Sequence, residues 1–122
     1  MDAIHVCLNV TDADRTAQWY IEELGFEDSW EFTTSDGETR NVYVTDGNGF
    51  ELQLSDTDGE DDHEAGTTWD HFAVKVDDVD EAFADIENHG VVQAPTDNDE
   101  AGARTAFIED PDGHVVELVE PL

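Results

Sequence analysis

Two stretches of the chain alternate apolar and polar residues with the period of a β-strand, and a helical pattern follows each of them. IHVCLNV at 4–10 precedes DADRTAQWYIEEL, and DHFAVKV at 70–76 precedes DVDEAFADIENH. Asp or Thr residues, which are favourable helix starts, introduce each helical pattern. Gly25 and Gly90 follow the last helical residues, where glycine commonly ends a helix. The pattern therefore predicts one strand–helix unit that occurs twice.

The ends of the two units match as well. DGNGFELQL at 46–54 lies over DGHVVELVE at 112–120, at the same offset of 66 that relates the first strands. Between helix and last strand, each half has room for two more strands, at 26–34 and 38–45 and at 91–94 and 103–109. Each half is thus predicted to be βαβββ, and the fold class to be α+β with two βαβββ repeats.

The chain has 122 residues, a usual size for one domain. We expect a single domain over 1–122, with repeat one at 1–55, an acidic and glycine-containing linker at 56–68, and repeat two at 69–122. A half of about 50 residues buries little surface by itself, so the two repeats are predicted to cooperate in one core.

Two histidines and two glutamates occupy equivalent points of the repeats. His5 and His71 are related by the offset of 66, and Glu51 and Glu117 each follow the histidine of their own half at a spacing of 46. A lone His or Glu on a strand is more often an ordinary surface residue, but the shared spacing joins the four into one hypothesis. Two imidazoles and two carboxylates suit a divalent ion such as Zn²⁺, Ni²⁺ or Co²⁺. Strand alternation places all four on the polar side, away from the helices.

The charge is extreme, because 33 Asp and Glu residues face 4 Lys and Arg residues, for a net charge of -29. Disorder would explain the acidity but conflicts with the apolar periodicity, and an acidic tail is excluded because the acid is spread along the chain. Molar salt screens such self-repulsion, so the composition predicts a halophilic protein. Without a basic patch, nucleic acid and anionic membranes are poor partners.

Two further observations concern location. No apolar stretch reaches the roughly 20 residues that span a bilayer. The single cysteine, Cys7, excludes an intrachain disulfide framework, which favours a cytoplasmic location.

The segments IHVCLNVTDADRTAQWYIEELGF, GFELQL, WDHFAVKVDDVDEAF and GARTAFIEDPDGHVVELVE resemble the vicinal oxygen chelate superfamily, and within it glyoxalase I. The resemblance covers nearly the whole chain and implies that superfamily's fold. Four residues fall on the metal-binding positions of glyoxalase I: His5, Glu51, His71 and Glu117. Glu51 is the discriminating residue, because related ring-cleaving dioxygenases usually keep a His, His, Glu set and epimerase-like members typically have Gln in the second position.

The resemblance also implies a reaction. The hemithioacetal of methylglyoxal and a thiol is isomerised to an S-lactoyl thioester, with Glu117 as the expected base and Glu51 as the other candidate. Relatives bind the carboxylates of glutathione with basic side chains, but Asn9 stands where a basic residue is common. We expect Asn9, Lys75 and Arg104 to bind substrate, and the thiol to be glutathione or a smaller one.

Two-unit relatives of this length commonly pair across chains, so the resemblance implies a homodimer with metal sites between chains; sites within one chain stay open. The alternatives for function are an epimerase or extradiol dioxygenase of the same superfamily, or a metal-free small-molecule binding or resistance protein.

Overall fold

The computed structural model describes residues 1–64 and 66–122, and the chain divides into two units, Met1–Glu64 and Ala65–Leu122. The division falls inside the predicted linker 56–68, of which residue 65 lies outside the described residues. Regular structure reaches two residues into that predicted linker, because the last strand of the first unit ends at Thr57.

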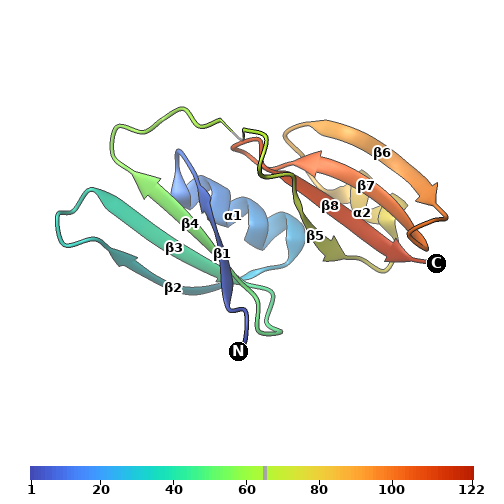
Figure 1. Ribbon diagram of the computed structural model, residues 1–122, viewed down its shortest axis with the longest axis horizontal. Helices are drawn as coiled ribbons and strands as arrows, with labels where there is room; N and C mark the ends of the chain where they lie inside the picture. The colour runs from blue at the N-terminus through green and yellow to red at the C-terminus, as the bar shows by residue number, and fades with distance from the viewer. Residues whose placement is uncertain (65) are drawn as a thin grey trace. The chain divides into compact units, whose positions relative to one another are not determined.

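The first unit contains one helix and one four-stranded sheet. Its elements are β1 (His5–Asn9), α1 (Ala13–Leu24), β2 (Glu27–Thr33), β3 (Thr39–Thr45) and β4 (Glu51–Thr57). The strand order is β1-β4-β3-β2, with β1 parallel to β4 and the other neighbours antiparallel (Figure 1). The first and last strands of the unit therefore lie side by side.

The second unit repeats this topology. Its elements are β5 (Phe72–Lys75), α2 (Val79–Asp85), β6 (Val91–Asn98), β7 (Ala103–Glu109) and β8 (Val115–Pro121). The strand order is β5-β8-β7-β6, and β5 is again parallel to β8. The predicted α+β class with two βαβββ repeats is confirmed.

Helix α1 covers one face of the first sheet and begins and ends as the sequence predicts. The Asp12 side chain accepts a hydrogen bond from the Arg15 amide at 3.1 Å, which satisfies one of the unpaired donors of the first turn. Gly25 ends the helix in the left-handed region at φ 74°, which residues with a side chain rarely adopt. Apart from the buried Thr16, the buried side of the helix and the strand residues beneath it are apolar: Ala13, Ala17, Trp19, Tyr20, Val42, Val44, Leu52 and Leu54.

Helix α2 is shorter than predicted, because it ends at Asp85 and not near Gly90. The Ile86 backbone is extended, and the Glu109 carbonyl and amide pair with the His89 amide and the Gly90 carbonyl at 3.0 and 2.9 Å. These residues therefore extend the sheet instead of the helix. Gly90 lies close to β7, since a Cβ built there would lie 2.5 Å from Oε2 at the end of the Glu109 side chain. The interpretation of Gly90 as a helix stop is wrong.

The two sheets are not related by one constant offset. The N-caps of the two helices, Asp12 and Asp78, keep the offset of 66 that the sequence match requires. The hairpins do not: Thr45 pairs with Glu51 in the first unit, and Glu109 pairs with Val115 in the second. In the last two strands of each unit, structurally equivalent residues are therefore separated by two residues fewer than 66. The predicted offset does not hold for these strands.

Candidate functional site

His5 and Glu51 lie at the edge of the open face of the first sheet, opposite α1. They are direct partners in the parallel pairing of β1 with β4. The His5 ring packs edge-to-face against Tyr43 of β3, with ring centroids 5.7 Å apart. Tyr43 stacks in turn on Trp30 and Phe32 of β2, whose side chains remain 51% and 41% exposed. An imidazole and a carboxylate therefore stand beside an aromatic patch on the open face.

The side chains next to His5 are held by polar contacts. The Ser29 hydroxyl donates to the Glu51 carboxylate. The Gln53 amide nitrogen donates to Asn41 Oδ1 at 2.9 Å. Burial raises the pKa of Tyr43, and the nearby Cys7 and Glu51 raise it further. The Tyr43 phenol is therefore a neutral group at neutral pH.

His71 and Glu117 are in contact in the second unit. His71 lies one residue before β5, and its Nε2 is 3.1 Å from Glu117 Oε1. Its Nδ1 donates to the carboxylate of Asp70, and its ring packs edge-to-face on Phe107 at 5.0 Å. The Asp70 hydrogen bond raises the pKa of His71 above its usual value, and the charge of Glu117 adds to this effect.

Asp70 is a functional candidate that the sequence analysis missed. A carboxylate on Nδ1 fixes the ring and leaves Nε2 directed at the ligand side, the usual arrangement behind a metal-binding histidine. The signal was available, since Asp70 is next to His71 in the sequence, but acidic neighbours are too common in this chain to stand out.

The donor atoms fit a divalent metal. Imidazole nitrogen and carboxylate oxygen are the ligand types of Zn²⁺, Ni²⁺ and Co²⁺ sites. The 3.1 Å contact between His71 and Glu117 shows that one ion can reach a nitrogen and an oxygen of this unit together. In the first unit, His5 and Glu51 are paired residues of β1 and β4 on the open face of the sheet.

The pattern of the Glyoxalase/Bleomycin resistance protein/Dioxygenase superfamily matches residues 3–118. The chain belongs to this superfamily. The predicted resemblance and fold are confirmed.

Similar members of the superfamily are enzymes by name. A lactoylglutathione lyase from Escherichia coli O157:H7 is 32% identical over 127 residues, which cover 98% of this chain and 93% of the relative. Glyoxalase I from Zea mays has a TM-score of 0.85 at 27% identity, covering 96% of this chain and 43% of that one. The trypanothione-dependent glyoxalase I of Leishmania major has a TM-score of 0.80 at 28% identity, covering 98% and 86%. The chain spans less than half the length of the plant lactoylglutathione lyases it matches.

The residues expected to bind substrate in this superfamily member lie in different places. Asn9 and Lys75 are exposed at the ends of β1 and β5, on the same faces as the histidines. Arg104 alternates to the helix-covered side of β7, where its guanidinium donates to Asp80 at 2.8 and 3.0 Å and to Asp97 at 3.1 Å. Arg104 is therefore committed to two carboxylates away from His71.

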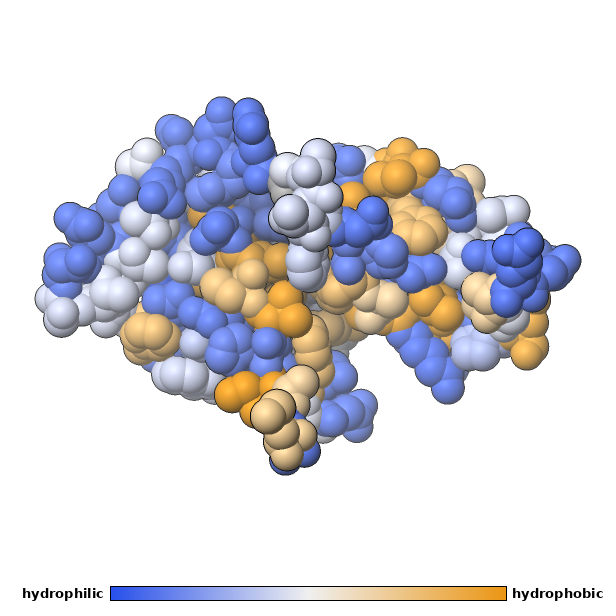
Figure 2. Space-filling model, viewed as in Figure 1, coloured by the Kyte–Doolittle hydropathy of each residue, from blue (hydrophilic) through white to orange (hydrophobic). Residues whose placement is uncertain are grey.

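A groove of about 400 Å³ lies over β6 and β7 in the second unit. Gln93, Thr105 and Phe107 form part of its lining, and residues 96–100, at the end of β6 and in the acidic turn that follows it, form the rest. Since Phe107 also contacts His71, the groove begins beside the His71–Glu117 pair. Figure 2 shows that hydrophilic residues cover much of the visible surface, in keeping with the acidic composition.

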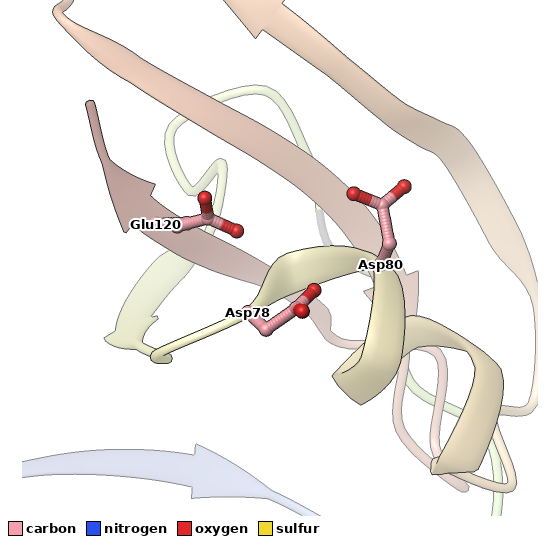
Figure 3. Close-up of side chains that lie close together, drawn as sticks. All are labelled: Asp78, Asp80 and Glu120. Carbon is pink, nitrogen blue, oxygen red and sulfur yellow. The ribbon is translucent and has the colours of Figure 1, made fainter.

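One group of carboxylates within the described residues has the spacing of a cation site: Asp78, Asp80 and Glu120 (Figure 3). Each already has a partner. Asp78 caps α2 by accepting from the Glu81 amide, Glu120 accepts from the Val79 amide at 2.8 Å, and Asp80 pairs with Arg104. Arg104 also lowers the pKa of Asp80.

The first unit repeats this arrangement at the start of α1. Asp12 caps the helix, Asp56 accepts from the Ala13 amide at 2.9 Å, and Asp14 pairs with Arg40 at 2.8 Å. The acidic group is therefore a repeated helix-capping device and not a distinct metal centre.

In the described part of the chain, the helices are too short or too polar to cross a membrane.

Proposed function

We propose that the protein is a metal-dependent lyase of the glyoxalase I type. It converts the hemithioacetal of methylglyoxal and a low-molecular-weight thiol into an S-lactoyl thioester, a detoxification of methylglyoxal. The observation that carries this proposal is the His71–Glu117 contact on the open face of the second sheet, with a second histidine, His5, at the equivalent place in the first. Similarity to lactoylglutathione lyases supports the choice of reaction.

The metal is held by four side chains: His5, His71, Glu117 and one residue of β4. For the residue of β4, the spacing of the sequence predicts Glu51. When bound, a divalent ion Ni²⁺, Co²⁺ or Zn²⁺ offsets negative charge that develops on the substrate oxygens, which is worth several kcal/mol. Asp70 supports this set by fixing the His71 ring.

Glu117 is the proposed base. Its carboxylate removes the proton from the carbon that bears sulfur and returns it to the neighbouring carbon, so the step is a net isomerisation with no oxidant. A positioned base typically contributes 10² to 10⁴-fold to the rate.

The identity of the thiol in the substrate depends on the cationic side chains near the histidines. Lys75 and Asn9 lie on the histidine faces, and with Arg104 paired elsewhere, Lys75 is the cation proposed to meet a substrate carboxylate. So few cations favour a thiol with fewer carboxylates than glutathione. That a Leishmania neighbour is described as trypanothione-dependent illustrates that the thiol differs among glyoxalases.

The decisive experiment is an assay of thioester formation from methylglyoxal with glutathione, cysteine or cysteamine. The protein is stripped with a chelator, reloaded with Ni²⁺, Co²⁺ or Zn²⁺, and followed by thioester absorbance. We expect turnover only with metal and at least one thiol. A protein that binds metal but consumes no hemithioacetal favours an epimerase or dioxygenase, and a protein that binds no metal favours a binding or resistance protein.

We also propose a homodimer in the cytoplasm whose metal sites are each shared between two chains. Support comes from the open face of each sheet, where a carboxylate lies near His5 in the first unit and near His71 in the second. The test mixes two inactive variants, one with His5→Ala and Glu51→Ala and the other with His71→Ala and Glu117→Ala. Shared sites restore up to half the normal activity per heterodimer. Sites within one chain leave every site crippled, so no recovery in confirmed heterodimers contradicts the proposal.

A further inference from the structure

The pairing of the strands identifies a different residue of β4 as the counterpart of Glu117. Glu117 pairs across the parallel strands with Ala73, the residue two after His71. In the first unit, the residue two after the histidine is Cys7, and its partner is Gln53. Counted from its own histidine, the position of Glu117 is therefore occupied by Gln53 in the first sheet.

The antiparallel hairpins lead to the same equivalence. Glu117 pairs with Phe107, and Gln53 pairs with Tyr43. Phe107 and Tyr43 are themselves counterparts, because each packs edge-to-face on the histidine of its own unit, at 5.0 and 5.7 Å.

The helix-covered side of the two sheets provides an independent check. Asp56 of β4 accepts from the Ala13 amide and Glu120 of β8 accepts from the Val79 amide, at 2.9 and 2.8 Å. Each carboxylate accepts a hydrogen bond from the first residue of its helix, so Asp56 corresponds to Glu120. Asp56 lies three residues after Gln53, as Glu120 lies three after Glu117. The sequence match of Glu51 with Glu117 instead joins positions that differ by two residues in the fold.

We propose that Gln53, and not Glu51, is the ligand that β4 contributes to the metal centre. This inference rests on the proposed function. With Gln53 as the ligand, the second position no longer separates the chain from epimerase-like members, so the hemithioacetal assay alone decides between the two reactions. The Gln53 amide nitrogen donates to Asn41 Oδ1, which fixes the side chain and leaves its carbonyl oxygen to bind a cation. The Glu51 carboxylate accepts a hydrogen bond from the Ser29 hydroxyl, and Glu51 pairs directly with His5 at the start of β4.

The assignment changes the chemistry of the centre. The ligand set becomes two imidazoles, one amide oxygen and one carboxylate, so the protein ligands carry one negative charge in place of two. Glu117 is then the single carboxylate in the set, and the role of base falls to it. Fewer anionic ligands leave more of the metal charge to act on the substrate oxygens.

Cysteine substitution reads the ligand position directly. In a Cys7→Ser background, Gln53→Cys and Glu51→Cys are each loaded with Co²⁺ and examined for a thiolate-to-cobalt charge-transfer band. A thiolate in the ligand set produces the band, since a metal-bound thiol is deprotonated. We expect the band for Gln53→Cys and none for Glu51→Cys. A band at position 51, at both positions or at neither overturns the assignment.

Metal affinity provides the second measurement. Titration with Co²⁺ against a chelator should show that Gln53→Ala weakens binding by about tenfold or more, a loss that even outer partners of a ligand can cause. Glu51→Ala should stay within about threefold of the parent by the same scale. Gln53→Glu keeps the size and an oxygen ligand, so it should bind at least as tightly as the parent. Circular dichroism and the thermal midpoint confirm folding of each variant.

The two proposals fail separately. If Gln53→Cys shows the band but the parent turns over no hemithioacetal, the function is wrong and the ligand assignment stands. If the parent is active but Glu51→Ala loses the metal while Gln53→Ala keeps it, the function stands and the ligand assignment is wrong.

Discussion

The two units share a scaffold and differ on their open faces. Each has the same strand order, an aspartate that caps its helix, a strand carboxylate that binds the first helix amide, and an arginine that pairs with a carboxylate in the first turn. On the open face, the first unit has stacked aromatic rings around Tyr43, whereas the second has a groove with an acidic turn beside Phe107. The contacts that hold each helix on its sheet are therefore the same in both units, whereas the side chains of the open faces differ.

This difference teaches where a repeat is informative. The strand carboxylates that bind the first amide of each helix, Asp56 and Glu120, occupy equivalent positions in the two sheets. They therefore show which residues of β4 and β8 correspond. Residues of the proposed metal centre need not be identical in the two halves, because each half can contribute a different ligand. A match between like residues, such as Glu51 and Glu117, can therefore mislead.

The largest expected effect separates the two glutamates. Glu117→Gln should reduce turnover by about 10² to 10⁴-fold, the contribution of a general base. Glu51→Gln should cost far less, because that carboxylate bonds Ser29 and lies outside the ligand position. Steady-state kinetics with saturating metal measure both. Equal losses in the two variants would contradict the division of roles between the units.

Salt should have the next largest effect, and it should act on both units. The net charge of -29 produces strong self-repulsion that molar salt screens. The thermal midpoint, followed from low to high KCl by circular dichroism, should rise by several degrees or more. A flat profile would refute the halophilic interpretation.

The two glycines that follow the helices should respond differently to alanine. Gly25→Ala should destabilise by about 1–2 kcal/mol, because the residue adopts the left-handed conformation. Gly90→Ala should cost less, because its Cβ would meet the end of the flexible Glu109 side chain. Urea unfolding measures the free energy of unfolding of each variant. A larger loss for Gly90→Ala would show that the backbone at residues 89–90 cannot move away from β7.

The smallest effects are expected at the paired arginines. Arg40→Met and Arg104→Met should each lower the thermal midpoint slightly, since exposed ion pairs contribute little. The KM for the hemithioacetal should stay unchanged in Arg104→Met, because Arg104 lies on the helix side. An increase in KM restricted to Arg104→Met would restore the sequence-based prediction that this residue binds substrate.

Local patterns predicted most of the fold. Alternation located the first strand of each unit, the match between the repeats located the last, and Asp12 and Gly25 located the ends of the first helix. The early end of α2 was not predictable, because it depends on hydrogen bonds between residues 89–90 and Glu109, which are distant in sequence.

Contacts between residues distant in sequence also limited the prediction of the candidate site. The histidines and Glu117 could be found from spacing, but the register of β4 could not. Residues 46–50 and 110–114 form loops of equal length, and only the pairing of the strands shows that the glutamates sit at different steps after them. The role of Asp70 also required coordinates, since it depends on which ring nitrogen it meets.

The parallel pairing of β1 with β4 has a consequence for the order of folding. The strands β2, β3 and β4 join through short loops and can pair early, whereas β1 must wait for a partner at the far end of its own unit. During synthesis, the first sheet has all of its strands once residue 57 has emerged, before any strand of the second unit exists. We therefore expect the histidine of β1 to reach its place in the last step of assembly of its own sheet.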